Sequence, residues 1–228
     1  MMATDPPAPI GLRVSRIAAI ALILLAWALN TGSWAANSEG EICDLTADSA
    51  LGLEDYPAAI ALHREFLRSH GDDALAHYHL GFAYGMTGRT TYEINEYLAA
   101  ARLGLHKWDL FLNLGLAYLG QNDSARAINA LQTAVLLGPT HPETHFNLAI
   151  AYEKGGRLHE ALLEITASLH LAPNDPDEGN TKAIICAELG DLVCARDEWA
   201  HLPDYRPARA NLAVLRDSHT PLVLRAEM

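Results

Sequence analysis

Two of the three cysteines, Cys186 and Cys194, stand at nearly equal distances from a turn at Gly190-Asp191. If the flanking segments are helices that fold back at this turn, the two thiols meet, and an oxidising compartment would join them in a disulfide. Closing so short a loop would stabilise the protein by about 2 kcal/mol. Two buried free thiols are the alternative. Cys43 lies far from both, so we expect it to be free or paired between chains.

The chain contains 11 histidines, which raises the question of a metal site. His141 and His145 are four residues apart, but Pro142 begins a helix between them, and His77 and His79 point to different faces of one helix. Neither pair has a Cys, Asp or Glu at a spacing that completes a tetrahedral set. We therefore interpret these histidines as solvated surface residues and predict no metal and no cofactor.

The sequence also lacks the motifs of common catalytic sites. It has no nucleophile elbow, no glycine-rich phosphate loop and no metalloprotease motif. Its glycines all fit turns or close contacts between helices. We predict that the protein is not an enzyme. Its net charge of −12 argues against a nucleic-acid partner, because nucleic-acid binding requires a basic surface.

The elements that position these side chains follow from an internal repeat of 34 residues. The segment 108–137 shows it most clearly, as two apolar helical patterns on either side of a Gly-Gln-Asn-Asp turn. Small residues recur at the eighth place of each unit and, except at Glu93, at the twentieth. The eighth residues are Ala47, Gly81, Gly115, Ala149 and Ala183. Such a period is typical of a solenoid, whose helix pairs stack because none has a sufficient core alone.

One unit contains, in order, Phe111, Leu114, Gly115, Tyr118, Ala127, Leu131 and Pro139, and the next contains Phe146, Leu148, Ala149, Tyr152, Ala161, Ile165 and Pro173. This pattern resembles the tetratricopeptide repeat family. The resemblance implies an all-α, right-handed superhelix of five helix pairs, at 40–73, 74–107, 108–141, 142–175 and 176–209. The first unit departs most, since its opening helix lacks the Leu, Gly and Tyr. We predict a capping helix at 210–218 and a flexible tail at 219–228.

In this family the first helix of each pair lines a concave groove that binds peptides, which implies a set of groove residues here. The polar ones, whose amides could bond a peptide backbone, are His79, Asn113, Asn147 and Thr181; the apolar ones are Tyr78, Phe82, Leu112, Leu116, Phe146 and Ile150. The alternative is that the asparagines are ordinary polar residues beside a neighbouring helix.

The second position of the units, acidic in all but the second unit, where it is Leu75, forms an acidic rim to this groove. Asp109, Glu143 and Asp177 stand there, and only Lys154 is basic among the inward residues. We therefore expect a partner protein that presents an extended neutral or basic segment, and not an acidic C-terminal tail.

The first 35 residues have the pattern of a secretory signal peptide. Arg13 and Arg16 precede an apolar run at 17–29, and Ser33-Trp34-Ala35 follows. We place cleavage after Ala35, with 36–39 as a linker. The alternative is an uncleaved anchor at 17–36. In both cases the arginines stay inside and the repeats lie outside the cytoplasm. We predict a periplasmic or secreted protein, or one anchored in the inner membrane.

These observations favour a scaffold that binds other proteins. Two further functions stay open. One is a structural or assembly subunit of an envelope complex, of the pilus, secretion or cytochrome-maturation type, that uses its outer face or an edge. The other is an accessory carrier of a ligand or a metal. The sequence does not identify the partner, because solenoids use one frame for many ligands.

Overall fold

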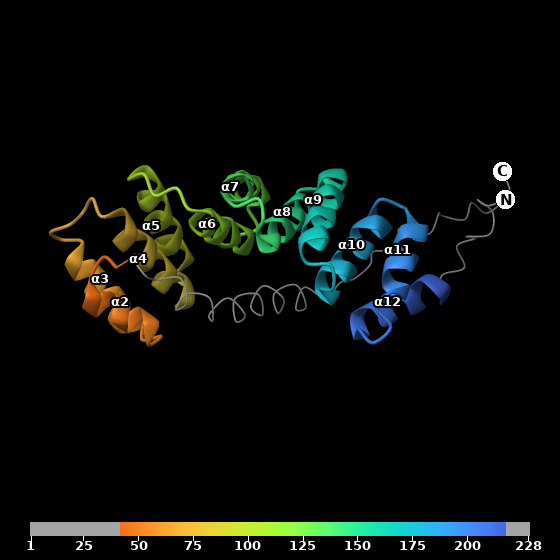
Figure 1. Ribbon diagram of the computed structural model, residues 1–228, viewed down its shortest axis with the longest axis horizontal. Coiled ribbons are helices and arrows are strands. Elements are labelled where there is room, and N and C mark those ends of the chain that lie inside the picture. The colour runs from red at the N-terminus through yellow and green to blue at the C-terminus, as the bar shows by residue number, and fades with distance from the viewer. Residues whose placement is uncertain (1–41, 218–228) are drawn as a thin grey trace, which may run out of the picture. The chain divides into compact units, whose positions relative to one another are not determined.

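The computed structural model describes residues 42–217, where every regular element is a helix. The helices are α2 (Leu45–Gly52), α3 (Tyr56–Phe66), α4 (Ala74–Met86), α5 (Thr90–Arg102), α6 (Trp108–Gly120), α7 (Ser124–Leu137), α8 (Pro142–Lys154), α9 (Leu158–Leu171), α10 (Pro176–Glu188), α11 (Leu192–Ala200) and α12 (Arg206–Asp217). Consecutive helices pack in pairs, from α2 with α3 to α10 with α11, and each pair contacts the next (Figure 1). This confirms the all-α solenoid predicted from the repeat.

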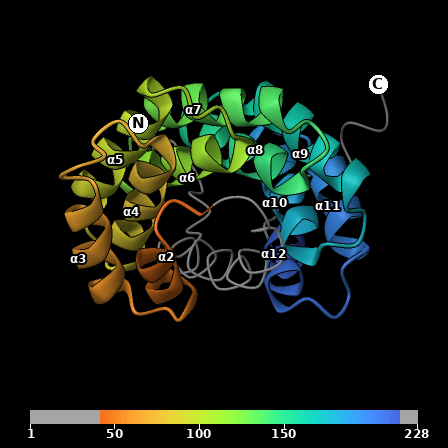
Figure 2. The ribbon, with the colours of Figure 1, turned by 60° about the vertical axis from the view of Figure 1, so that its left-hand side comes forward.

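Within residues 43–217 the helix pairs follow a curved path (Figure 2). The first helices α6, α8 and α10 lie on the inner side of the curve, and the second helices α7, α9 and α11 lie on the outer side. The first helices thus line the inner side, where the resemblance predicts the candidate binding residues.

Aspartates begin many of these helices. Asp44, Asp73, Asp123 and Asp191 accept hydrogen bonds from backbone N–H groups in the first turns of α2, α4, α7 and α11. These N–H groups have no partner inside their own helix, so the carboxylates stabilise the helix starts. Part of the negative charge of the chain thus serves helix capping.

The turn inside each pair contains one residue with a left-handed backbone, always at the fifteenth place of the unit. These residues are Glu54 (φ 59°), Gly88 (φ 71°), Asn122 (φ 58°), Gly156 (φ 72°) and Gly190 (φ 81°). Glycine adopts this region without strain and asparagine tolerates it. The same turn geometry therefore repeats in all five pairs, including the first pair, whose sequence departs most from the pattern.

Close contact between paired helices explains the small residues at the eighth place. A Cβ atom added to Gly115 would lie 2.5 Å from Cγ of Leu131, and one added to Gly81 would lie 2.7 Å from Cδ1 of Tyr97. Leu131 and Tyr97 are themselves buried. A continuous apolar core runs from α4 to α10, and a second cluster around Trp199 joins α10, α11 and α12.

The C-terminal helix α12 begins at Arg206, earlier than the 210–218 range expected for a capping helix. Its early residue Ala208 is buried in the Trp199 cluster. The predicted signal peptide, linker and tail lie outside the described residues. Within residues 42–217, no helix is both long and apolar enough to cross a membrane.

Candidate functional site

The side chains predicted to line the groove fall into two groups. Tyr78, His79, Leu112 and Asn147 are at most 6% exposed. These four offer a peptide little open surface, and peptide binding by them stays a prediction. The partly exposed group comprises Phe82, Asn113, Leu116, Phe146, Ile150 and Thr181. Peptide binding by this second group stays a prediction.

Hydrogen bonds distinguish the polar members of this set. Asn147 Nδ2 donates to the carbonyl oxygen of Glu143 (2.8 Å), and Thr181 Oγ1 donates to that of Asp177 (2.8 Å). Both groups thus bond their own helix. Asn113 Nδ2 lies 3.5 Å from the Tyr78 hydroxyl oxygen, which is long for a hydrogen bond. Asn113 is therefore the amide best placed to exchange its partner for a peptide group.

The three carboxylates of the predicted acidic rim are partly exposed. Asp109 accepts a hydrogen bond from the Leu110 backbone N–H (2.8 Å), and Asp177 accepts one from the Tyr205 hydroxyl. Glu143 lies 3.4 Å from His141 Nδ1. The inner side is acidic in three successive units, although each carboxylate already has a neighbouring donor.

Cys186 and Cys194 meet across the turn between α10 and α11, as their spacing predicted. Their Cα atoms are 5.9 Å apart, within the range that a disulfide requires. The geometry permits the bond, and its formation in the cell stays a prediction.

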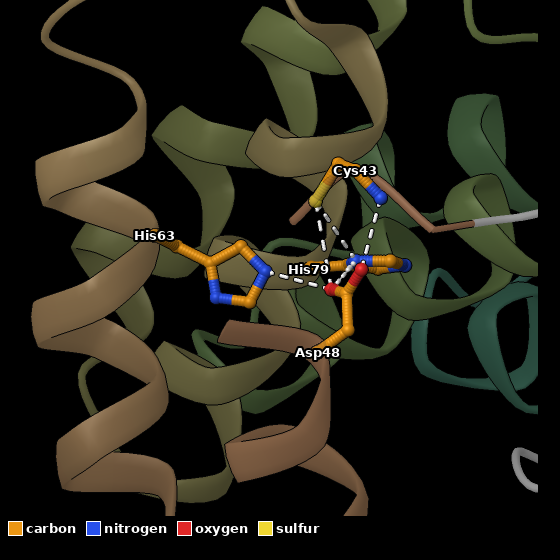
Figure 3. Close-up of side chains that lie close together, drawn as sticks. All are labelled: Cys43, Asp48, His63 and His79. Carbon is orange, nitrogen blue, oxygen red and sulfur yellow. Dashed lines mark hydrogen bonds and ion pairs between the residues drawn. The ribbon is translucent and has the colours of Figure 1, made fainter. Parts of the chain in front are cut away.

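Four side chains that commonly bind metals lie together at the N-terminal end of the repeats (Figure 3). Cys43 lies two residues before α2, Asp48 on α2, His63 on α3 and His79 on α4. Asp48, His63 and His79 are buried and Cys43 is partly buried. One ligand atom from each lies within 4.8 Å of the other three. The expectation of solvated histidines is therefore wrong for His79, because its side chain is buried against Asp48 of α2 and His63 of α3.

The carboxylate of Asp48 lies at the centre of this cluster. Its Oδ1 lies 3.1 Å from His63 Nε2, 2.7 Å from His79 Nδ1 and 3.5 Å from Cys43 Sγ. Burial acts to raise the pKa of Asp48, but hydrogen bonds from His63 and His79 outweigh it and hold that pKa below its ordinary value. Burial and the charge of Asp48 raise the pKa of the Cys43 thiol.

Further hydrogen bonds orient these side chains. Asp48 Oδ2 accepts from the backbone N–H groups of Cys43 (2.9 Å) and Asp44 (3.3 Å). His63 Nδ1 donates to the Ala59 carbonyl oxygen (2.9 Å). These contacts direct Asp48 Oδ1 and His63 Nε2 into the cluster.

The repeat register contains a signal that could have found two of these residues. Asp48 is the ninth residue of its unit, where the later units have Phe82, Leu116, Ile150 and Ile184. His63 is the twenty-fourth, where they have Tyr97, Leu131, Ile165 and Trp199, all buried. Polar side chains at positions that are otherwise apolar indicate a specialised buried contact in the first unit. A search for metal motifs by short spacing misses it.

A family model, described as tetratricopeptide repeat, matches residues 45–104 and 112–176, which is more than half of the chain. The chain belongs to the tetratricopeptide repeat family. Tetratricopeptide repeat proteins are in general non-enzymatic scaffolds for protein–protein interaction. The fold, the repeat register and the family thus agree.

Several solved structures of tetratricopeptide repeat proteins share this fold. YrrB, described as having an unusual peptide-binding site, is 22% identical, with 72% of this chain and 87% of YrrB aligned at a TM-score of 0.69. MamA is 17% identical over 77% of this chain and 98% of MamA, with a TM-score of 0.65. MamA from Desulfovibrio magneticus RS-1 is 16% identical over 75% and 93%, with a TM-score of 0.65. No curated protein sequence matches this chain.

Proposed function

We propose that this protein is an exported, non-enzymatic scaffold that holds an extended, neutral or basic segment of a partner protein along the inner side of its repeats. The observation that carries the proposal is a row of partly exposed apolar side chains at the ninth place of successive units. Phe82, Leu116 and Ile150 form this row, on α4, α6 and α8. Each repeat thus offers one apolar contact to a segment that runs across the units.

Polar groups beside this row support an extended occupant. Asn113 lies on α6, as Leu116 does, and its side chain faces Tyr78 of the preceding unit. Its amide offers both a donor and an acceptor to a peptide backbone. Asp109, Glu143 and Asp177 place negative charge at equivalent positions of three units. Like charges in close contact are costly, so this surface favours neutral or basic segments over acidic ones. Export is supported by the arginine and apolar pattern of the first 35 residues.

A peptide array tests this proposal with the full-length chain. Arrays of extended peptides with acidic, neutral and basic compositions would be probed with the wild type and with Leu116→Arg/Ile150→Arg. We expect at least about tenfold stronger binding of neutral and basic peptides, and a loss of at least about tenfold in the double variant, because it removes two apolar contacts. Circular dichroism melting would verify that the variant is folded.

Matched controls lie on the second helices. Leu136 and Leu163 are 80% and 71% exposed on α7 and α9, so Leu136→Arg/Leu163→Arg makes the same change on the outer side. Binding should be unaffected in this control. Equal losses in both double variants, or a preference for acidic peptides, would contradict the proposed surface.

The second candidate function is assembly through the outer helices. Several leucines on these helices, or directly after one of them, are exposed: Leu103, Leu136, Leu137, Leu163 and Leu171. Large exposed apolar groups often mark contact surfaces. In crosslinking of native cells, partners lost only from Leu136→Arg/Leu163→Arg would favour an assembly subunit over a peptide-binding scaffold.

A further inference from the structure

We propose that Cys43, Asp48, His63 and His79 form a Zn²⁺ site that fastens the first repeat to the second. Zinc binds sulfur at about 2.3 Å and nitrogen or oxygen at about 2.0–2.2 Å, so neighbouring ligand atoms of a tetrahedral site lie roughly 3.2–3.6 Å apart. Two distances match: Cys43 Sγ to Asp48 Oδ1 (3.5 Å) and Cys43 Sγ to His79 Nδ1 (3.5 Å). Asp48 Oδ1 lies closer to His63 Nε2 (3.1 Å) and to His79 Nδ1 (2.7 Å), so this oxygen must move outward by about half an ångström to admit the ion. All four ligand atoms lie within 4.8 Å of one another.

The orientation of His63 also matches that of a metal ligand. Its Nδ1 faces the Ala59 carbonyl oxygen, which can only accept, so Nδ1 carries the hydrogen. In the neutral ring, Nε2 then directs its lone pair at the Asp48 carboxylate. Two lone pairs 3.1 Å apart repel unless a cation lies between them, either a proton, which makes the ring a charged donor to Asp48, or a metal ion in its place. Metal-binding histidines commonly donate their second nitrogen to a backbone carbonyl in this way.

The ligand types fit a divalent ion of zinc character. A Cys43 thiolate and the Asp48 carboxylate together carry two negative charges, which Zn²⁺ balances while both imidazole rings stay neutral. This balance matters because an uncompensated charge in a buried site is costly. The mixture of sulfur, nitrogen and oxygen ligands suits zinc better than calcium or magnesium, which prefer oxygen.

The position of the site points to a structural role. Four protein ligands leave no open position, which is typical of structural and not catalytic zinc. Besides Asp48, the short helix α2 buries only Ala47 and Leu51. A metal that joins the segment before α2 to α2, α3 and α4 would supply the stability that this small apolar contact lacks. It would thus close the N-terminal end of the core.

Metal binding to the untagged, full-length, reduced protein tests the proposal without any substitution. After treatment with a chelator, Zn²⁺ would be added and the bound metal measured by elemental analysis. We expect one Zn²⁺ per chain and, at about a hundredfold excess over Kd, a rise in melting temperature of roughly 5–10 °C. Co²⁺ should give the visible absorption of a tetrahedral site and a thiolate-to-cobalt charge-transfer band.

Substitutions then assign the ligands. Cys43→Ser should abolish the charge-transfer band. Cys43→Ser and His63→Gln should each weaken Zn²⁺ binding at least about a hundredfold, because loss of a group that only hydrogen-bonds to a metal ligand already costs about 10–100-fold. The matched control is His145→Gln. His145 is less buried than His63, but it too bonds a carboxylate and a backbone carbonyl, those of Glu164 and Pro139, so this variant should bind Zn²⁺ like the wild type.

Two results would overturn the site. One is a wild-type protein that retains no zinc and melts at the same temperature with and without it, which leaves the cluster as a set of hydrogen bonds centred on Asp48. The other is stoichiometric zinc binding that persists unchanged in Cys43→Ser and His63→Gln. Cys43→Ser keeps a similar size at a partly buried position, so misfolding should not obscure the comparison.

Discussion

Glu93 is a buried carboxyl group with little support from its neighbours. It is 2% exposed and stands where later units have Ala127, Ala161 and Ala195. Its Oε1 has no hydrogen-bond partner among residues 42–217. Burial raises the pKa of Glu93 to about 8, so the carboxyl is protonated in the folded protein at neutral pH.

This shift predicts how stability depends on pH. The unfolded chain releases the Glu93 proton near pH 4.3, whereas the folded protein keeps it until about pH 8. The stability from Glu93 is thus fully present below about pH 4.3 and is lost as the pH rises through about 8. Through Glu93, the free energy of unfolding of the wild type should fall by on the order of 4 kcal/mol between about pH 5 and about pH 9, and this fall should be absent in Glu93→Gln. Urea unfolding of both proteins across this pH range measures the difference.

Two other residues provide a control for this experiment and explain the pH dependence of stability that should remain in Glu93→Gln. Glu65 is 67% exposed, so Glu65→Gln should unfold with the wild-type pH dependence. The hydrogen bond that His77 Nδ1 donates to the Glu96 carboxylate raises the pKa of His77, which adds stability at low pH and removes it as the pH rises. Glu93→Gln should therefore keep a smaller slope of the same sign. An unchanged slope would show that Glu93 is ionised in the folded protein.

Single residues also mark the limit of what the sequence could predict about sites. The Cys186–Cys194 encounter was predictable because both residues flank one turn. The cluster of Cys43, Asp48 and His63 was missed, because a search by short spacing does not relate the segment around α2 to α3; only the polar residues at apolar places of the repeat register indicate it. Tyr78 and Leu112 were placed in the groove by position alone. Position within a repeat gives the face of a helix, but not how closely the next helix covers it.

At the scale of elements, the prediction was most successful where packing leaves little freedom. The eighth place of each unit must be small, since Gly115 and Gly81 lie directly against the side chains of the paired helix. The period of 34 residues could therefore be detected despite large changes at other positions. The first unit was the weakest match because its opening helix lacks the Leu, Gly and Tyr of the pattern, and Asp48 and His63 also replace apolar residues there. Its helices still form, supported by the Asp44 cap and the cluster.

Gly115→Ala tests the close contact between α6 and α7. The new methyl group would lie 2.5 Å from Cγ of Leu131, and Leu131 is fully buried, so the helices must separate. We expect a loss of about 1–3 kcal/mol in the free energy of unfolding, as for other overpacked cores, measured by denaturant titration.

The matched variant is Gly120→Ala at the end of the same helix. No atom lies within 4 Å of a Cβ at this position, and alanine has a helix propensity higher by about 1 kcal/mol. Gly120→Ala should therefore be neutral or slightly stabilising. If the two variants were equally stable, the small residue at the eighth place would not be required by packing.

At the scale of the whole molecule, stability is distributed along a row of units that contact mainly their neighbours. In such arrays each end can open without the middle. The N-terminal end contains the Asp48 cluster, and the C-terminal end contains the Cys186–Cys194 pair beside Trp199. Both ends of the described repeats thus combine a small apolar core with residues that could form a cross-link.

The effect of the C-terminal pair should therefore be local. If the disulfide forms, it closes a short loop and stabilises the fold by about 2 kcal/mol, and Cys186→Ser removes this stabilisation. Hydrogen exchange should then accelerate in α10, α11 and α12, while α6 and α7 keep their protection. Cys43→Ser is the control, since it lies at the other end and should leave α10 to α12 unchanged. Alkylation of Cys186 without a reductant, or acceleration spread evenly along the chain, would contradict a cross-link that acts only on the last unit.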